Sequence, residues 1–362
     1  MQFFSKRALG IDIGAASIKV VELSAVGDKK ILENYLEFKL PRAASPLKTF
    51  YGNSMLLLNN EVSDILQSLF KKAKIEVRKA AFSIPDFSTF FTTFDLPPMT
   101  EAEIPQAITF EARHHIPLPL SEMIFDWQII EKEPASPGVK LKVLLVAVPN
   151  KVLDSYQRLA ALCNLEVKGL EAEVFGLIRS SVKAGKYWGP VCLVDIGWQS
   201  TTVSIVDKMI LRVSHSFDFS SSSLTRVLSQ AMGLNEEQAE DLKIRGGLDL
   251  KNEQVANILL KEIDILTLEV EKICANFSQA ASETSSATGQ AEDKTLNDII
   301  LAGGGATLFG LKEYFASRLK KNVQITKPFS TFFYPPILQE RLEEIGSSFA
   351  VASGLAMMAL EV

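Results

Sequence analysis

Two stretches of the chain, about half its length apart, show the same succession of apolar and polar positions. GIDIGAASIKV (10–20) and LVDIGWQSTTV (193–203) each run from apolar residues into Asp-Ile-Gly, cross a small or polar turn and become apolar again. Apolar runs separated by a glycine-containing turn predict two strands joined in a hairpin. The repetition predicts a chain built from two duplicated halves.

Elsewhere the hydrophobic pattern predicts strands alternating with helices. We expect strands at 31–41, 79–85 and 298–302, and helices over 59–75, 170–185, 252–281 and 346–360. Residues 282–294 are rich in small polar side chains and predict a mobile loop tip. The last helix is rich in Ala, Ser and Gly, a composition that suits close packing against another helix or a strand.

Residues 86–166 differ from their surroundings and predict a compact α+β insert in the first half. The pattern predicts a strand, a helix introduced by Thr100 with Glu103 three residues later, two strands joined by the loop KEPASPG, and a helix capped by Asn150. We expect its core, or in part a peptide groove, to be lined by the aromatic run Phe87, Phe90, Phe91 and Phe94.

Composition narrows the class of protein. At 362 residues the chain exceeds what one hydrophobic core usually supports, so two domains are expected, and 47% hydrophobic with 22% charged residues is typical of a folded protein. A net charge of −5 gives no basic surface for nucleic acid. We expect buried thiols in a reducing compartment and structural histidines, because no zinc-site spacing occurs among Cys163, Cys192, Cys274, His114, His115 and His215.

The chain has no stretch that we expect to cross a membrane. The longest apolar run, 349–360, is shorter than the roughly 20 residues needed to span a bilayer, and MQFFSKRAL at the start lacks the apolar core of a signal peptide. We therefore expect a cytoplasmic protein that meets a membrane only through a partner.

The two hairpins have the chemistry of a phosphate site. Turn amides bind phosphate oxygens, the carboxylates of Asp12 and Asp195 can hold Mg²⁺ through water, and a glycine lets the phosphate approach the backbone. Two such turns half a chain apart predict a single ligand held from both sides. The candidate phosphate-binding residues of the hairpins are Asp12, Gly14, Ala15, Ser17, Asp195, Gly197, Ser200 and Thr201.

A third glycine element, Gly303-Gly304-Gly305, lies between the strand at 298–302 and a helix that extends to residue 321. Three glycines allow a ligand to approach the backbone closely, and the N-terminus of the following helix favours an anion. Neither a Walker motif nor GxGxxG occurs, which argues against a P-loop or dinucleotide fold. Each element alone is compatible with an ordinary strand turn, whereas the three in this order favour a nucleotide site.

This order of elements resembles the actin, Hsp70 and sugar-kinase superfamily. Lys19 follows Asp12 by seven residues, the spacing of the phosphate-contacting lysine in actin. QAEDLKIRGG (238–247) resembles the Ala-Glu-x-x-Lys segment by which bacterial members reach the nucleoside, which implies that role for Glu240 and Lys243, beside Gly303, Gly304 and Gly305. The ordinary alternative for Glu240 and Lys243 is a surface ion pair on one helix.

Within this superfamily the chain resembles the PilM family of type IV pilus assembly proteins, relatives of the division protein FtsA. FFSKRALGIDIGAASIKVVELS is similar to the N-terminus of that family, LPPMTEAEIPQAITFEARHHIPLPLSEMIFDWQII and LLVAVPNKVLDSYQRLAALCNLEV to its inserted subdomain, and IILAGGGATLFGLKEYFASRL to its adenosine loop. The resemblance implies an α/β, actin-like ATPase fold of two duplicated ribonuclease-H-like halves with a small α+β insert. The implied boundaries are 1–85 with 167–190 and 336–362 for the first lobe, 86–166 for the insert, and 191–335 for the second lobe with a helical part at about 215–297.

The resemblance also implies ligands and a location. ATP with Mg²⁺ would lie between the lobes, with Asp12 and Asp195 near the metal. The protein would be a cytoplasmic scaffold, peripheral to the inner membrane, that clasps the cytoplasmic N-terminal tail of PilN in a groove between the first lobe and the insert. Contacts with other platform proteins or motor ATPases and self-association are compatible with this picture, whereas nucleic acid and a membrane span are not expected.

Several residues depart from the pattern of relatives that hydrolyse ATP. The second hairpin carries Trp198, where actin has an aspartate, and Gln199, and an indole cannot orient an attacking water as a carboxylate does. Ser220 and Ser221 stand where many relatives have a Gly-Gly pair beside the terminal phosphate. The connecting segment also lacks the usual glutamine, for which Glu171 or Glu173 would have to substitute. We therefore expect nucleotide binding with weak or absent hydrolysis.

Two other functional classes are also compatible with the sequence. A sugar or acid kinase of the same fold would need a catalytic aspartate in its substrate domain, and such kinases do not carry this insert. An FtsA-like filament protein or a platform protein of type II secretion is the second alternative. The basic amphipathic C-terminal tail of FtsA is absent here, which weakens the filament reading.

Overall fold

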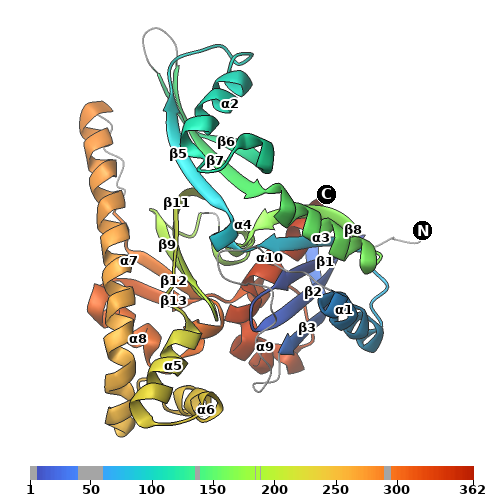
Figure 1. Ribbon diagram of the computed structural model, residues 1–362, viewed down its shortest axis with the longest axis vertical. Helices are drawn as coiled ribbons and strands as arrows, with labels where there is room; N and C mark the ends of the chain where they lie inside the picture. The colour runs from blue at the N-terminus through green and yellow to red at the C-terminus, as the bar shows by residue number, and fades with distance from the viewer. Residues whose placement is uncertain (1–5, 40–59, 135–138, 184, 188, 289–294) are drawn as a thin grey trace.

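The computed structural model describes residues 6–39, 60–134, 139–183, 185–187, 189–288 and 295–362. Two lobes, each built on a five-stranded sheet, lie side by side, and a smaller unit of three strands and a helix rises from the junction between them (Figure 1). The end of the strand expected at 31–41 and the part of the expected loop tip at 289–294 lie outside the described residues.

The first lobe contains a sheet with the strand order β3-β2-β1-β4-β8. β1 pairs antiparallel with β2 and parallel with β4. Its strands are β1 (Lys6–Ile13), β2 (Ser17–Val26), β3 (Lys29–Lys39), β4 (Lys79–Ile84) and β8 (Glu166–Ala172). Helices α1 (Asn60–Ala73) and α3 (Asn150–Leu162) pack on one face of this sheet, and α4 (Glu173–Ser181) and α10 (Ala350–Glu361) pack on the other.

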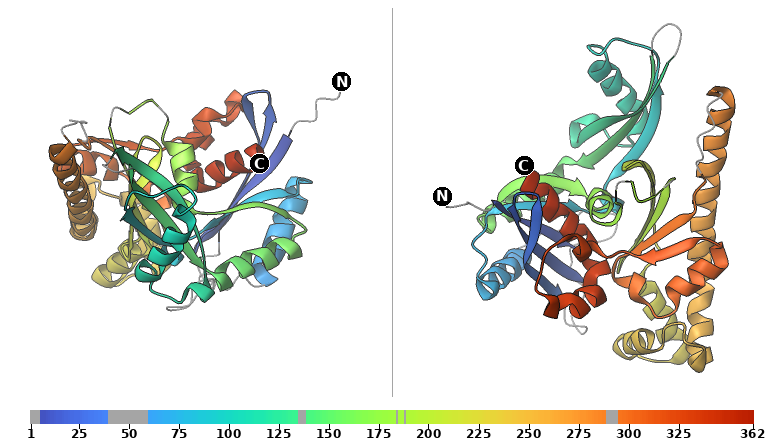
Figure 2. Two further views of the ribbon diagram at one scale, coloured as in Figure 1. Left: turned by 90° about the horizontal axis from the view of Figure 1, so that it is seen from above. Right: turned by 180° about the vertical axis from the view of Figure 1, so that it is seen from behind.

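The second lobe repeats this topology with the strand order β11-β10-β9-β12-β13. Its strands are β9 (Val191–Ile196), β10 (Thr201–Asp207), β11 (Ile210–Phe217), β12 (Asp298–Ala302) and β13 (Asn322–Ile325). The helices that follow are α5 (Ser221–Met232), α6 (Glu236–Gly246), α7 (Glu253–Thr288), α8 (Leu311–Leu319) and, leading back to the first lobe, α9 (Gln339–Ile345). β9 pairs antiparallel with β10 and parallel with β12, as β1 does with β2 and β4, so the prediction of duplicated halves is confirmed. α7 runs along the outer side of this lobe (Figure 1 and Figure 2).

The insert is a three-stranded antiparallel sheet, of order β5-β7-β6, covered by one helix. Its elements are β5 (Phe90–Leu96), α2 (Ile104–His115), β6 (Met123–Pro134) and β7 (Val139–Pro149). The order of elements through 162 is the predicted strand, helix, strand, strand, helix. However, the last of these helices, α3, buries Val152, Tyr156 and Leu159 against the first lobe's sheet, not against the insert.

Several predicted element ends differ from the structure. The helix expected over 170–185 begins only at Glu173, because residues 166–172 form the edge strand β8. α7 continues to residue 288, so the part of the expected loop tip at 282–288 is helical.

The predicted starts of two helices near the insert were also wrong. Glu103 accepts hydrogen bonds from the amide and hydroxyl of Thr100, at 2.8 and 2.7 Å, but α2 itself starts one residue before Pro105. Asn150 is the first residue of α3, and its side-chain amide donates to the carbonyl of Ser121 at 2.9 Å, so it is not the cap.

The small residues of α10 allow two close backbone contacts, as the sequence predicted. A Cβ on Gly10 of β1 would lie 2.0 Å from the carbonyl oxygen of Ala352. A Cβ on Gly354 would lie 1.9 Å from the carbonyl oxygen of Gly176 in α4. α10 is thus wedged between a strand and a helix. Over the described part of the chain, no helix is both long and apolar enough to cross a membrane.

Candidate functional site

The two hairpins have the same turn geometry. The Gly14 N–H donates to the carbonyl of Ser17, and the Gly197 N–H donates to the carbonyl of Ser200, both at 3.0 Å. A Cβ would lie 3.3 Å from the carbonyl oxygen of Ser17 at Gly14 and 2.8 Å from that of Ser200 at Gly197. A side chain would therefore clash at Gly197 and be a tight fit at Gly14, and the amides of both glycines are used to close the turns.

Asp12 stands at the end of β1, opposite Lys19 in the register of the first hairpin. Only 7% of Asp12 is exposed, and its carboxylate accepts a hydrogen bond from the Ser83 hydroxyl at 2.8 Å. The Lys19 ammonium lies 3.9 Å from the other carboxylate oxygen. The structure thus places Lys19 beside Asp12. In the second hairpin the corresponding pair is Asp195 and Thr202, so Lys19 has no counterpart there.

Asp12 of the first lobe and Asp195 of the second lobe lie close enough for the charge of one to affect the other. The pKa of Asp195 is raised to about 6, chiefly by burial and also by the charge of Asp12, while Lys19 lowers it. Charges influence each other in this way only at short range. The hairpins of both lobes therefore converge on one region.

Two further carboxylates, Asp86 and Glu173, join this region. Asp86 lies just after β4, separated from it by Pro85; its carboxylate accepts a hydrogen bond from the Val174 N–H, while its own N–H donates to Glu173, both at 3.2 Å. The pKa of Asp86 is raised to about 7, chiefly by burial and also by the charge of Asp195, while hydrogen bonds from the Val174 N–H and from Thr202 lower it. Burial, followed by the charge of Asp86, also raises the pKa of Glu173 well above its usual range.

The sequence pointed to Glu171 or Glu173 and contained no indication of Asp86. Glu171 is held in a two-bond ion pair with Arg179, at 2.9 and 3.0 Å, so only Glu173 belongs to the carboxylate cluster. Asp86 had no recognisable sequence signal, because an acid after a strand-ending proline is typical of ordinary turns.

The cluster of Asp12, Asp86, Glu173 and Asp195 is rich in the oxygen donors that Mg²⁺ prefers. Across the described ranges, however, no three His, Cys, Asp or Glu side chains are arranged to hold a metal ion directly. This donor set fits a metal that is bound partly through water and through its own ligands, which is how Mg²⁺ commonly binds.

The glycine loop is packed against the second hairpin. Gly303 has a φ of 81°, and a Cβ there would lie 2.4 Å from a carboxylate oxygen of Asp195. A Cβ on Gly305 would lie 2.3 Å from the Ile196 side chain, whereas one on Gly304 would meet no atom of the described residues within 4 Å. Packing therefore explains the outer glycines but not Gly304. The expected helix does not follow at once, because a 3-10 turn (Gly304–Thr307) precedes α8.

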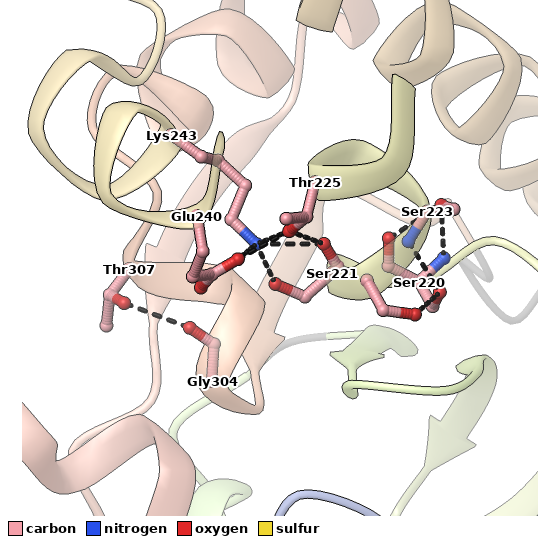
Figure 3. A network of polar contacts seen from close by, with 9 residues as sticks. Ser220, Ser221, Ser223, Thr225, Glu240, Lys243, Gly304 and Thr307 are labelled. Atoms are coloured by element: carbon pink, nitrogen blue, oxygen red, sulfur yellow. Dashed lines mark hydrogen bonds and ion pairs between the residues drawn. The ribbon is translucent and has the colours of Figure 1, made fainter. Parts of the chain in front are cut away.

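Lys243 lies within a closed polar network (Figure 3). Its ammonium donates to the carbonyl and hydroxyl of Ser221 and to the hydroxyl of Thr225, each at 2.8 Å, and lies 2.7 Å from the Glu240 carboxylate. It also lies 5.5 Å from the centre of the Trp198 ring. Only 3% of Lys243 is exposed, so its charge holds α5, α6 and the second hairpin together in this conformation.

The polar groups at the start of α5 are likewise hydrogen-bonded within the protein. Ser220 caps the helix through a mutual pair of hydrogen bonds with Ser223, both at 3.1 Å. The Ser221 N–H donates to the carbonyl of Gly197 at 2.9 Å, and the Ser222 N–H donates to that of Trp198 at 3.1 Å. Of the two serines expected in place of a Gly-Gly pair, Ser221 thus bonds to the hairpin, whereas Ser220 bonds to Ser223.

One exposed aromatic side chain near these elements was not predicted from the sequence. Phe309, which follows the glycine loop, is 61% exposed, and its carbonyl accepts a hydrogen bond from the Leu248 N–H at 2.8 Å. That bond places Phe309 beside the end of α6. A single phenylalanine between two elements carries no sequence signal of its own.

The aromatic run at the start of the insert is divided between two environments. Phe94 lies in the core of the insert, where the His115 ring stacks on it at 4.8 Å. Phe91 packs against Phe175 of the first lobe, at 6.4 Å between ring centres, whereas Phe87 is exposed. The run therefore joins the insert to the first lobe, and the histidine that stacks on it is structural, as expected.

Two pockets, of about 330 and 320 Å³, lie at the opposite end of the second sheet, around the segment that leads into β9. Tyr187 and Gly189 line both of them. Neither pocket is lined by a residue that was predicted to contact a nucleotide.

Comparisons with known proteins agree with this architecture. The sequence profile of the family described as "Type IV pilus assembly protein PilM" matches residues 10–360. The structure is similar to that of a PilM–PilN type IV pilus biogenesis complex, with a TM-score of 0.81 and 21% identity over 98% of this chain and 99% of that one. It also resembles the ethanolamine utilization protein EutJ of Carboxydothermus hydrogenoformans (TM-score 0.55, 16% identity, 97% of this chain and 89% of that one).

A third similar structure is MreB5 of Spiroplasma citri bound to AMPPNP, with a TM-score of 0.52 and 13% identity over 96% of this chain and 94% of that one. At these identities the similarities show the fold. They confirm the predicted actin-like ATPase fold.

Proposed function

The chain belongs to the PilM family of type IV pilus assembly proteins, and from this premise we propose that it is a nucleotide-binding scaffold of the pilus assembly platform. It binds ATP with Mg²⁺ between its two lobes. It also binds the cytoplasmic N-terminal tail of a PilN-type inner-membrane protein in a groove between the first lobe and the insert. This places it in the cytoplasm, peripheral to the inner membrane through its partner.

The observation that carries the nucleotide proposal is the convergence of two identical hairpin turns, each with one aspartate. Because the amides of Gly14 and Gly197 close the turns, the phosphates are bound by the remaining turn groups, which include Ala15, Ser17 and Ser200. Lys19 supplies the positive charge, and Asp12 and Asp195 hold the hydrated Mg²⁺.

The nucleoside lies toward the glycine loop and α6. Gly304, whose Cβ direction is open, lets the ligand approach the backbone, and the exposed ring of Phe309 stacks on the base. Glu240 hydrogen-bonds the sugar. Lys243 does not contact the nucleotide directly, because its donors are already used within the protein. It holds Glu240 and the second hairpin in place.

Hydrolysis is weak or absent in this proposal. Trp198 lies over the Lys243 charge and offers no carboxylate to the attacking water. The amides of Ser221 and Ser222 are bonded to the hairpin and do not face a terminal phosphate. Glu173 is the one connecting-segment acid in the cluster, and its raised pKa disfavours the charged form that a general base needs.

Isothermal titration with Mg²⁺ and AMPPNP tests the nucleotide site. Asp12→Asn, Asp195→Asn and Gly304→Ala should each weaken binding at least tenfold, since they remove a metal-holding charge or fill the space of the ligand. Asp95→Asn, which changes an exposed ion pair of the insert, serves as the matched control and should bind normally. Unaltered affinity in both aspartate variants of the hairpins would refute the site.

The partner proposal rests on the family and on the similarity to a structure described as a PilM–PilN complex. A synthetic peptide of the partner's cytoplasmic tail should bind the purified protein in a titration. A scrambled peptide of the same composition is the control, and equal affinity for both peptides would contradict the groove.

A further inference from the structure

Two β-bulges face each other where the insert meets the second lobe. In the pairing of β6 with β7, the register shifts between Ile129 and Glu131, so Ile130 is an extra residue on β6. In the pairing of β10 with β11, the register shifts so that Arg212 is an extra residue on β11. Bulges redirect side chains and are over-represented at the edges of sheets and next to active sites. Here each bulge directs one residue toward the other.

The contact between the bulges is short and largely buried. One terminal nitrogen of Arg212 lies 2.6 Å from the Glu131 carboxylate and 3.3 Å from the carbonyl oxygen of Ile130. Its other terminal nitrogen lies 3.5 Å from Asp207 in β10. The side chains of Arg212 and Asp207 are 10% and 8% exposed, and that of Glu131 is 26% exposed. The guanidinium group therefore bridges one acid of the insert and one of the second lobe.

Apolar side chains extend this contact. Ile130 and Leu144 of the insert share a cluster of buried residues with Val206 and Leu211 of the second lobe. Burying an ion pair usually contributes little net stability compared with apolar packing, but it fixes the relative position of the groups that it joins. The arrangement is thus suited to holding the insert at one position on β11. Figure 1 shows β11 at the foot of the insert.

The insert is consequently attached to both lobes in different ways. Through the chain it is continuous with β4 and α3 of the first lobe, and through Arg212 it is bonded to the second lobe. If the angle between the lobes changes, the insert either follows the second lobe or breaks the bridge. Following the second lobe changes the groove between the insert and the first lobe.

We propose that Arg212, bridging Glu131 and Asp207 at the facing bulges, is a positioning residue that makes the insert follow the second lobe and so couples nucleotide binding to binding of the partner tail. The inference rests on the proposed function, because it links its two sites. Coupling of this kind is reciprocal: the factor by which nucleotide changes the affinity for the tail equals the factor by which the tail changes the affinity for nucleotide.

The experiment measures the affinity for the synthetic tail peptide with and without saturating Mg²⁺ and AMPPNP, using the full-length chain. The ratio of the two affinities should differ from one by at least about fivefold in the wild type, within the usual range of allosteric factors. Glu131→Gln and Arg212→Lys, which weaken the bridge while leaving a polar side chain in place, should bring the ratio to within about twofold of one. Each variant should still bind each ligand alone. Asp95→Asn, the exposed control in the same insert, should keep the wild-type ratio.

The possible outcomes separate this inference from the proposed function. A wild-type ratio of one with both ligands bound overturns the coupling and leaves the proposed function intact. A ratio that stays at the wild-type value in Glu131→Gln and Arg212→Lys, with only a lowered melting temperature, shows that the bridge is structural and also overturns it. Failure of the wild type to bind either ligand overturns the proposed function and the coupling together.

Discussion

At the scale of single residues, the junction of the lobes concentrates negative charge. Asp12, Asp86, Glu173 and Asp195 influence one another there, and Lys19 is the positive group beside Asp12. Buried like charges disfavour ionisation of their neighbours, so part of the cluster retains protons near neutral pH in the absence of a ligand. A metal–nucleotide complex, which brings cationic Mg²⁺, changes that balance.

The raised pKa of Asp86 should make the stability of the protein depend on pH. Its pKa is raised by burial from 3.8 to about 7, so between these values the folded state holds a proton that the unfolded chain has released. The stabilising contribution of this group is therefore complete below about pH 4 and is lost as the pH rises through 7. The Asp86→Asn variant has no titratable group at this position. Relative to the wild type, its free energy of unfolding should increase between pH 5 and pH 8, by on the order of 2 kcal/mol.

Urea unfolding curves of both proteins across this pH range measure the effect. Asp95→Asn, which removes an exposed carboxylate outside this cluster, is the control. A stability difference between Asp86→Asn and the wild type that does not change with pH would contradict the burial assigned to the Asp86 carboxyl group.

The sequence predicted the residues that lie within a repeated pattern. Asp12 and Asp195 stand at the same place in two copies of one hairpin, which made them visible without a structure. Asp86 and Arg212 belong to no repeat: Asp86 depends on where the chain leaves β4, and Arg212 on a bulge in β11. Such positions are set by tertiary contacts, which one sequence does not display.

Among the elements, α10 shows how a helix rich in small residues can pack with its backbone close to the backbones of its neighbours. Its apolar residues surround the helix, and its glycine and alanines let β1 on one side and α4 on the other approach the helix backbone. The sequence revealed the small residues but not their partners. The limits of α3 and α7 were harder to predict, because α3 continues directly from β7 and α7 extends into residues of small polar character.

Gly354→Ala tests this close packing. The added Cβ would lie 1.9 Å from the Gly176 carbonyl oxygen, so α10 must move from α4, and we expect a loss of about 1–3 kcal/mol in the free energy of unfolding. Gly246→Ala is the matched control, because that helical glycine has only ordinary contacts, with the nearest atom at 3.5 Å. The control should be neutral or stabilising by up to about 1 kcal/mol, since alanine favours helix. Equal losses of stability for the two variants in urea unfolding would contradict the close packing of α10 against α4.

At the scale of the whole molecule, packing divides the chain differently from its sequence order. The segment 86–166 was expected to form one insert, yet α3 supplies Val152, Tyr156 and Leu159 to the core of the first lobe. The sheet of the insert, by contrast, begins with Phe90 and Ala147 as paired neighbours. Pattern along the chain identified the order of elements in this segment, whereas only the three-dimensional contacts show with which core each element packs.

This division predicts that two deletions behave differently. Removing 90–147 and joining Thr89 to Val148 with a short Gly-Ser linker should give a folded protein, because antiparallel neighbours at this position are only about 5 Å apart. It should still bind Mg²⁺ and AMPPNP but lose the partner peptide. Its melting temperature should fall, because two side chains that pack against the insert, Leu211 and Phe175, would become exposed to solvent. Removing 86–166 takes away Asp86 and α3 as well and should prevent cooperative folding.

Circular dichroism melts followed by titration with each ligand distinguish the two deletion variants. A cooperative melt after removal of 86–166 would show that α3 is dispensable to the first lobe. Retained peptide binding after removal of 90–147 would place the partner outside the groove, while the nucleotide proposal would stand. Because the first sheet keeps α3, α4 and α10 on its two faces in the shorter deletion, we expect the lobes to remain intact and the loss to be confined to the partner.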